Sequence, residues 1–412
     1  MLARTFRSYK TAYQGLSTET WWLSFVMLIN RSGTMVVPFM TIYLTSSEMN
    51  YTISQAGIVM GLFGLGAIAG AHISGKLTDK FGFYPIQIIT LGGGGLLFII
   101  LGMMKTYHLI CVFTFLLSFV NEAFRPANST AIAFYSKEHN RTRSYSLNRL
   151  AINLGWALGN AIGGLLASID YQLLFWFDGI TNIAAAILMW ILLSPANNGR
   201  IEKKKDEILV KGAVYKDKIY LWFILLVMIF ATCFFQLFTN LTAYYRNELK
   251  FSERFIGILG ALNGLIIAVF EMVLIFRLEG RRPALYYISR GVLLCSVAYL
   301  VLATLQVGHW WVVCMVLLIT AGEMLSMPFM NSFWISRTQS HNRGEYAALY
   351  TIAWASAQTF GPVAGAFIAQ YAGYSVLWWV IGLSFLAVAF GYLQLKKFSE
   401  IETKALNTIS NT

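Results

Sequence analysis

His139-Asn140-Arg141 returns 202 residues later as His341-Asn342-Arg343, and this repeated stretch decides the predicted fold. Further residues repeat at nearly the same distance, in two sets. Pro126 with Pro328 and Gly159 with Gly361 keep the offset of 202, while Ser54 with Ser252, Gly66 with Gly264 and Pro85 with Pro283 share an offset of 198. The chain is therefore predicted to be a duplicated helical bundle, an organisation typical of membrane transporters.

The composition indicates a membrane protein. Hydrophobic residues make up 57% of the chain and charged residues only 12%, whereas a soluble domain has roughly 25% charged residues. A bilayer core about 30 Å thick needs about 20 mostly apolar residues per helix. Twelve such segments lie near 20–44, 54–74, 86–104, 108–134, 146–168, 173–193, 219–243, 254–276, 285–304, 310–334, 346–370 and 375–395. The predicted fold class is an all-α integral membrane protein with twelve transmembrane helices in two pseudo-symmetric six-helix bundles.

The basic residues predict the orientation of these helices. Of 31 lysines and arginines, 23 fall in the two termini and the even-numbered connections, so both termini are predicted to be cytoplasmic. The predicted domains are an N-terminal six-helix bundle at 1–195, a cytoplasmic linker at 196–218 and a C-terminal six-helix bundle at 219–412. Because topology accounts for the formal charge of +12, we expect no nucleic-acid partner. We expect a multi-pass protein of the cell inner membrane whose partners are the lipid bilayer, protons and a small-molecule substrate.

Several other classes of protein are disfavoured by the motifs. Cys111, Cys233, Cys295 and Cys314 lie within predicted spans without metal-ligand spacing, so no metal site is expected. The glycine string 92–95 has no lysine after it, so it is not a nucleotide loop. Hydrolase motifs of the H-E-x-x-H and G-x-S-x-G types are absent from the sequence, which argues against an enzyme. A non-transporting sensor would need an appended soluble domain. We expect no cofactor, with the proton gradient as energy source.

The connection between the second and third segments reads Gly75-Lys76-Leu77-Thr78-Asp79-Lys80-Phe81-Gly82. Gly75 and Gly82 are expected to permit a tight backbone reversal, and Pro85 suits the first turn of the next helix. The run resembles the cytoplasmic signature of the major facilitator superfamily, G-x-L-x-D-R/K-x-G. The resemblance implies that Asp79 approaches the start of helix 11 near 344–347 and holds the cytoplasmic side closed, with Lys80 on the same face. The alternative is that these charges only anchor a short loop in water.

A second resemblance lies in the fifth segment. Gly155, Gly159, Gly163 and Gly164 follow the spacing of the superfamily's antiporter signature, G-x3-G-P-x2-G-G, and present a smooth strip for close helix packing. Asn160 stands in place of the proline, so the direction of transport stays open, and packing alone is an equal explanation for the glycines. The stretches 124–127 and 149–155, with Asn30-Arg31 and Pro38-Phe39, resemble the bacterial multidrug-exporter-like branch, whose members are drug:proton antiporters.

Ionic residues within the spans are the candidate site residues, because a charge near the bilayer centre costs about 2.5–3.5 kcal/mol on the insertion scale. For proton coupling we expect Glu323 first, then Glu271 and then Glu122. A desolvated carboxylate holds its proton more readily, and an approaching cation favours its release. Glu122 ranks last because Arg125 stands three residues on, where the two can pair. That pair is structural or functional, and the sequence leaves both open.

The predicted substrate-binding residues combine basic and amide side chains: Arg31, Asn30, Arg125, Gln236, Asn240 and Asn263. Arg31 lies halfway along helix 1 and favours an anionic or carboxylate-bearing substrate. The predicted conformational gate comprises Gly75, Asp79, Lys80, Gly82, Gly155, Gly159 and Gly163. Asp178 and Arg149 lie nearer the ends of their spans, where snorkelling is expected to accommodate their charges.

The sequence thus predicts a proton-coupled secondary transporter that works by alternating access as a functional monomer. Its expected activity is multidrug-type efflux of a small amphipathic or anionic organic molecule. The alternative with the same fold is a proton-coupled importer of a peptide, sugar acid or metal chelate. A membrane enzyme or a sensor is the alternative from another class.

Overall fold

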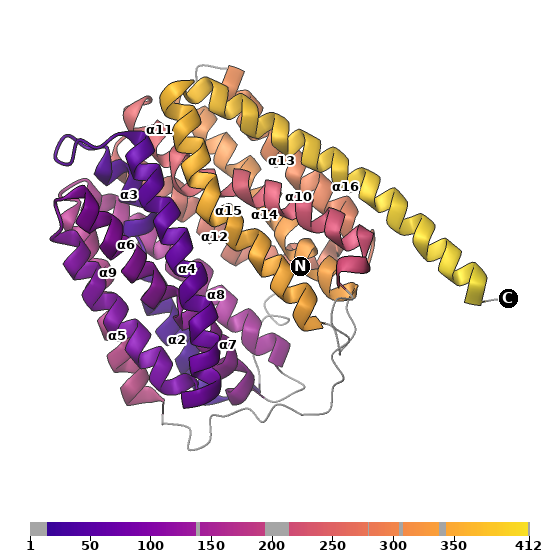
Figure 1. Cartoon of the computed structure of the whole chain (residues 1–412), viewed down its shortest axis with the longest axis horizontal. Helices are drawn as coiled ribbons and strands as arrows, with labels where there is room; N and C mark the ends of the chain where they lie inside the picture. Colours follow the sequence, from indigo (N-terminus) through magenta and orange to yellow (C-terminus); the bar gives the residue numbers. More distant parts are fainter. Residues whose placement is uncertain are drawn as a thin grey trace, which may run out of the picture. The chain divides into compact units, whose positions relative to one another are not determined.

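A computed structural model describes residues 15–136, 141–193, 214–278, 280–304, 308–337 and 343–410, and within them every regular element is helical (Figure 1). The first half contains α2 (Thr18–Ser32), α3 (Val36–Leu44), α4 (Ile53–Phe81), α5 (Phe83–Gly102), α6 (Tyr107–Glu122), α7 (Phe124–Tyr135), α8 (Arg141–Ala167) and α9 (Gln172–Leu192). The second half contains η2 (Val214–Lys216), α10 (Lys218–Phe234), η3 (Phe235–Phe238), α11 (Asn240–Asn247), α12 (Glu253–Leu278), α13 (Ala284–Thr304), α14 (His309–Ser336), α15 (Arg343–Tyr371) and α16 (Tyr374–Ser410).

Eleven helical stretches in the described part of the chain are long and apolar enough to cross a membrane. α15, with 29 residues, supplies the length of a twelfth span. Three spans contain interrupted helices: α2 with α3, α6 with α7, and α10 with η3 and α11. The predicted all-α membrane fold is confirmed, whereas the cytoplasmic location of the termini stays a prediction.

The chain separates into two compact units. Unit 1 comprises Met1–Tyr43, Leu62–Lys203 and Phe251–Ala268, and unit 2 comprises Leu44–Gly61, Lys204–Lys250 and Val269–Thr412. Within unit 1, α2 packs on α8, and α5 packs on both α6 and α9. Within unit 2, α10 packs on α15, and α13 packs on both α14 and α16. Each unit therefore has the same internal packing pattern, as a duplicated bundle requires. The linker predicted at 196–218 lies mostly outside the described residues, and the predicted domain limits stay a prediction.

Each unit includes the first part of one helix from the other half of the sequence. In unit 1, α12 meets α8, where a Cβ at Gly164 would lie 2.7 Å from the Cα of Gly257. In unit 2, the start of α4 meets α15, where the N–H of Ser54 donates to Oε1 of Gln370 over 2.8 Å. Close helix contacts of this kind depend on small residues, because a larger side chain would hold the backbones apart.

The sequence repeat also appears in the backbone. The stretch His139-Asn140 and its copy His341-Asn342 lie outside the described residues, but Arg141 and Arg343 begin the long helices α8 and α15. Gly82 joins α4 to α5 with φ +87°, and Gly280, 198 residues later, has φ +74°. Both glycines occupy the left-handed region, where a Cβ would be strained, so a glycine is favoured at the matching position of each half.

Candidate functional site

In unit 1, the first transmembrane span is interrupted between Ser32 and Val36. Asp178 of α9 is fully buried beside the interruption, and its Oδ2 accepts a hydrogen bond from the backbone N–H of Val36 over 2.7 Å. A carboxylate is favourable there, because the first N–H groups of a helix lack intrahelical partners and carry partial positive charge. Its Oδ1 is buried without a hydrogen-bond partner in the described ranges. The prediction that Asp178 snorkels was wrong, since this carboxylate points into the bundle as a helix cap.

Asn30 takes part in the same buried network. Its Nδ2 donates to Oδ1 of Asn182 over 2.7 Å, and Nδ2 of Asn182 donates to the carbonyl oxygens of Gly33 (3.1 Å) and Asp178 (2.8 Å). The amides thus hold the interrupted end of α2 against α9. This structural use of Asn30 does not test its predicted contact with substrate.

Three ionic side chains come together in unit 1. Nε of Arg125 lies 2.5 Å from Oε2 of Glu122, with 59% of the arginine side chain exposed and 7% of the glutamate. Arg31 is buried and lies within electrostatic range of both. The Nε of Arg31 has no hydrogen-bond partner among the residues that the structure describes. One carboxylate therefore faces two guanidinium groups, which gives the cluster an excess of positive charge.

The glycine strip of α8 packs against the interrupted span. A Cβ at Gly155 would lie 2.6 Å from Cβ of Arg31, one at Gly159 would lie 2.7 Å from the carbonyl oxygen of Ser32, and one at Gly163 would lie 2.7 Å from Cγ of Met35. These glycines allow α8 to approach α2 more closely than any side chain would permit. The geometry explains the strip by packing, and its predicted role in gating stays untested.

Unit 2 contains a matching interruption after Phe234, 202 residues beyond Ser32. Nε2 of Gln236 donates to the carbonyl oxygen of Gly361 over 2.7 Å, and Nδ2 of Asn240 donates to Oε1 of Gln236 over 2.6 Å. A second bond from Asn240 reaches the carbonyl oxygen of Pro362 over 3.3 Å. Both predicted substrate-binding amides therefore hydrogen-bond this interruption to the helical turn of α15 that contains Gly361 and Pro362.

The remaining polar candidates lie on α12 and α14. Glu271 and Glu323 are buried in unit 2, whereas Asn263 is half-buried on the part of α12 that belongs to unit 1. Glu323 follows Gly322, where α14 approaches α13 so closely that a Cβ would lie 2.5 Å from Sγ of Cys295. Glu323 interacts electrostatically with that thiol. It therefore lies against the interface of α13 and α14.

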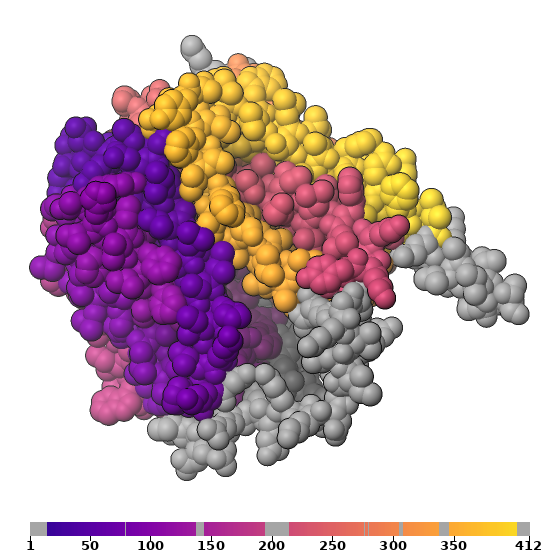
Figure 2. All heavy atoms as spheres, in the orientation of Figure 1, coloured from indigo at the N-terminus to yellow at the C-terminus, as the bar shows by residue number. Residues whose placement is uncertain are grey.

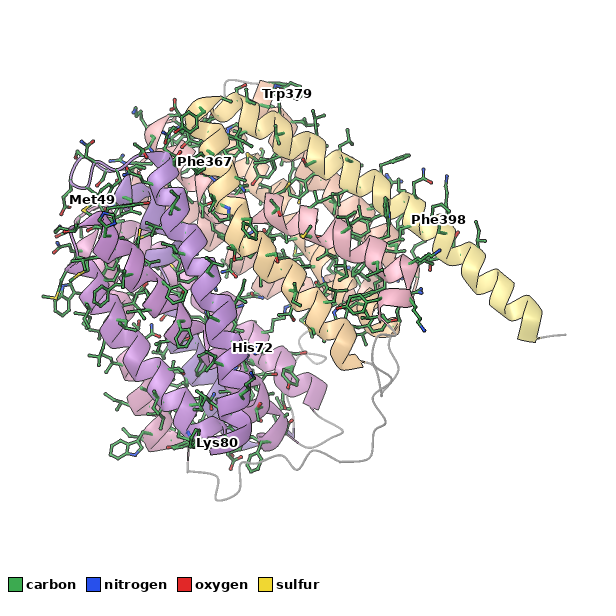
Figure 3. All side chains as sticks on the ribbon, viewed as in Figure 1. Met49, His72, Lys80, Phe367, Trp379 and Phe398 are labelled. Carbon is green, nitrogen blue, oxygen red and sulfur yellow. The ribbon has the colours of Figure 1, made fainter. Side chains whose placement is uncertain are left out.

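The backbone of the predicted gate motif, residues 75–82, differs in part from the prediction. Gly75 lies inside α4 with open space where its Cβ would be, and the helix continues to Phe81. Gly82 alone makes the reversal, so the prediction of a turn built from two glycines was wrong for Gly75. Lys80 lies at the end of α4 with Nζ 5.1 Å from the ring centroid of Phe81 (Figure 3). The side chains of Asp79 and of Glu345, in the expected partner segment 344–347, lie outside the described part, so the latch stays a prediction.

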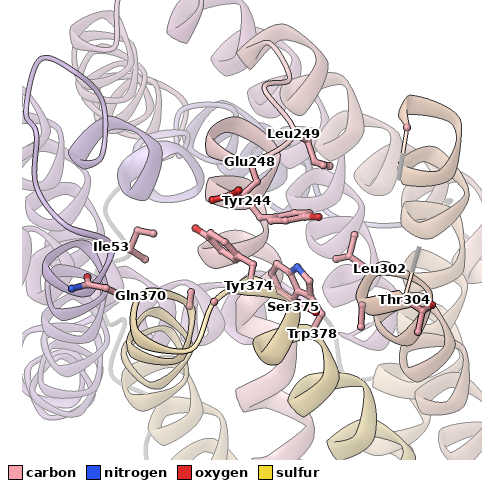
Figure 4. Close-up of a pocket in the computed structure, with 14 residues that line it drawn as sticks. Ile53, Tyr244, Glu248, Leu249, Leu302, Thr304, Gln370, Tyr374, Ser375 and Trp378 are labelled. Carbon is pink, nitrogen blue, oxygen red and sulfur yellow. The ribbon is translucent and has the colours of Figure 1, made fainter. Parts of the chain in front are cut away.

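A cavity of about 1050 Å³ in unit 2 contains none of the predicted site residues (Figure 4). Its aromatic wall is formed by Tyr244, Tyr374 and Trp378, whose ring centroids lie 5.1–5.8 Å apart. Glu248 is the single charged residue among its fourteen lining residues. Sequence reasoning missed this cavity because its lining comes from the ends of separate spans, which only the fold brings together.

Comparisons with known proteins agree with this architecture. The family model of the Major Facilitator Superfamily matches residues 20–362. Tetracycline resistance protein, class B, of Escherichia coli is 23% identical over 344 residues, which cover 81% of this chain and 84% of that protein. Quinolone resistance protein NorA of Staphylococcus aureus (strain MSSA476) is 22% identical over 307 residues, covering 73% and 76%.

Solved structures share the fold at low sequence identity. A mutant of the nucleoside transporter NupG has a TM-score of 0.78 and 10% identity, covering 92% of this chain and 100% of that one. A POT family transporter in complex with a thioalcohol-conjugated peptide has a TM-score of 0.77 and 16% identity, covering 93% and 97%.

An interrupted first span, a glycine-lined partner helix and buried ionic groups occur here in a bundle that is present twice along the chain, an organisation found in membrane transporters. The chain belongs to the Major Facilitator Superfamily. It is a multi-pass membrane transporter of small molecules and not an enzyme.

Proposed function

We propose that the protein is a proton-coupled exporter of small amphipathic or anionic organic molecules in the bacterial inner membrane, working as a monomer. Two relatives of different origin are named as drug-resistance proteins, and each covers most of this chain. At 22–23% identity these relatives support efflux as the class of activity. The identity of the substrate requires an argument from the site itself.

The buried guanidinium of Arg31 is the observation that carries the proposal. Its Nε lacks a hydrogen-bond partner in the described ranges, and the neighbouring carboxylate of Glu122 is already bound by Arg125. A buried polar group without a partner costs roughly 1–3 kcal/mol, and a charged one costs more. A carboxylate or another anionic group on the substrate would supply the missing acceptor and balance the excess positive charge. Asn30, Arg125, Gln236, Asn240 and Asn263 are proposed as further substrate-binding groups.

Proton coupling is assigned to buried carboxylates, with Glu323 first, then Glu271 and Glu122. Glu323 is the first choice because it is buried at the contact of α14 with α13, beside the thiol of Cys295. Glu122 is the last because Arg125 is already paired with it. The energy source is the proton gradient, with no cofactor. The proposed gate is the latch at Asp79 and Lys80 together with Gly75, Gly82 and the glycine strip of α8.

Transport by the purified protein in liposomes tests this proposal. Norfloxacin, a fluorescent quinolone with a carboxylate, is placed outside vesicles whose interior is acidic, and uptake into the lumen is followed in vesicles that expose the cytoplasmic face. We expect accumulation that exceeds the passive trapping of the norfloxacin amine in protein-free liposomes with the same pH gradient, and this excess should stop when nigericin collapses the gradient. Accumulation that nigericin does not affect would show that transport is not driven by the pH gradient. If uptake occurred only in the direction in which protons flow, the importer alternative would replace export.

A further inference from the structure

Three cationic side chains surround one aromatic ring in unit 2. Cζ of Arg282 lies 5.6 Å, Cζ of Arg290 5.4 Å and Nζ of Lys396 5.7 Å from the ring centroid of Tyr286. Any two of these charges are therefore at most about 11 Å apart, close to the Debye length of about 8–10 Å in physiological salt. Tyr286 and Arg290 belong to α13, and Lys396 comes from α16, which packs against α13 (Figure 1).

The described residues neutralise this cluster poorly. Oε1 of Glu400 lies 3.6 Å from Nζ of Lys396, and the glutamate side chain is 51% exposed. A long, exposed pair of this kind contributes little stability. Arg282 and Arg290 have no carboxylate within 4 Å among the described residues. The tyrosine ring offers each cation only a cation–π attraction, which leaves the cluster in need of an anion.

The surface beside the cluster is apolar. α16 exposes large apolar side chains at helical spacing, on a face turned about 140° around the helix axis from Lys396: Leu383, Leu386, Phe390, Phe398 and Ile401. Figure 3 shows Phe398 projecting from α16, and Figure 2 shows the spheres of this helix at the molecular surface. α13 exposes Val297, which lies two helical turns from Arg290 and so on the same face. Cationic groups at one end of such a face suit a molecule with an anionic head and apolar tails.

We propose that Arg282, Arg290 and Lys396 bind the phosphate group of an anionic phospholipid, whose acyl chains lie along the exposed face of α13. Guanidinium groups match phosphate oxygens through paired hydrogen bonds, and basic pockets between transmembrane helices hold anionic head groups. The cluster lies at the end of unit 2 that the charge distribution predicts to be cytoplasmic. The site is independent of the substrate and of proton coupling.

The test is lipid binding by the full-length protein in neutral detergent, titrated with phosphatidylglycerol and measured by native mass spectrometry. We expect the double variant Arg282→Gln/Arg290→Gln to lose affinity by about fivefold for each charge removed. The matched control is Arg281→Gln, which removes one charge from the neighbouring exposed arginine and should change affinity less than twofold. Monodispersity and the thermal midpoint show whether each variant is folded, and Tyr286→Phe should bind like wild type.

Two further measurements show whether the bound phosphate belongs to an anionic lipid or is free in solution. Phosphatidylcholine with the same acyl chains should bind weakly, because its head group has no net charge. Inorganic phosphate at 10 mM should leave bound phosphatidylglycerol in place, because it lacks the apolar tails. Equal loss in the double variant and in Arg281→Gln, unchanged binding in the double variant, or full displacement by inorganic phosphate would overturn the proposal.

Discussion

Replacement of Gly155 by alanine tests the close contact that fixes Arg31 in unit 1. A Cβ at this position would lie 2.6 Å from Cβ of Arg31 and 2.9 Å from the carbonyl oxygen of Leu28. Non-bonded carbon atoms pack best at about 3.5–4.0 Å. The second neighbour is backbone, so it cannot rotate away, and α2 must move by about 1 Å relative to α8.

The expected change in the free energy of unfolding for Gly155→Ala is the sum of two opposing effects. Overpacking of a close contact typically costs about 1–3 kcal/mol, whereas replacing glycine by alanine inside a helix gains about 0.5–1 kcal/mol. We therefore expect Gly155→Ala to lower the free energy of unfolding by about 1–2 kcal/mol. Gly92 of α5 is the matched control, because its Cβ would have Ala186 as nearest neighbour at 3.9 Å, an ordinary contact. Gly92→Ala should raise the free energy of unfolding by about 0.5–1 kcal/mol.

Thermal unfolding of the two purified variants, followed by intrinsic fluorescence, measures the difference. For a domain of about 150–250 residues, 1 kcal/mol moves the midpoint by roughly 2–4 °C. The two midpoints should shift in opposite directions relative to wild type. Shifts of the same sign and size would refute the reasoning, because helix propensity alone would then explain both substitutions.

Four further substitutions test the ionic groups. Arg31→Ala should lower affinity at least tenfold more for anionic than for neutral quinolone derivatives, measured by ligand-induced thermal shift; equal losses would contradict a role in charge recognition. Glu323→Gln should abolish pH-driven accumulation in liposomes while equilibrating flux continues, so a variant that still concentrates substrate would exclude Glu323 as the proton carrier. Asp79→Asn should slow turnover severalfold with substrate affinity unchanged, and normal turnover would remove the latch. Arg337→Ala breaks two bonds to Asp217, at 2.7 and 2.8 Å, and should lower stability by about 1–3 kcal/mol in chemical unfolding; a loss no larger than that of Lys396→Ala would contradict this.

The fold was predictable from the sequence because the strongest evidence for it consists of patterns within single stretches of the chain. Apolar length locates the spans, and glycine spacing on α8 predicted the strip that contacts α2. The pairing of Glu122 with Arg125 was also predicted, from their spacing of three residues. In each case the information lies within one helix or in the order of helices along the chain.

The interruption of the first span was missed, because hydropathy averaged over a window of about 20 residues does not register a break of three residues. Pro38, in the first turn of α3, was the available signal for a helix start at this point. The role of Asp178 was not predictable, since nothing in α9 shows which helix end it faces. Gly75 was misjudged for a related reason: an isolated glycine fits a helix interior as well as a turn, and the surrounding apolar pattern favours the helix.

The two interruptions begin at matching positions of the repeat and differ in chemistry. In unit 1 the start of α3 is capped by a carboxylate, whereas in unit 2 the corresponding break is fastened by the carboxamides of Gln236 and Asn240. A carboxylate can take up a proton, and the charge that favours the helix start is then lost. Carboxamides do not titrate, so the bonds they form are the same at any pH in the physiological range. Duplication therefore supplied an interruption in each half, and divergence of a few polar side chains placed a carboxylate beside the one that follows Arg31.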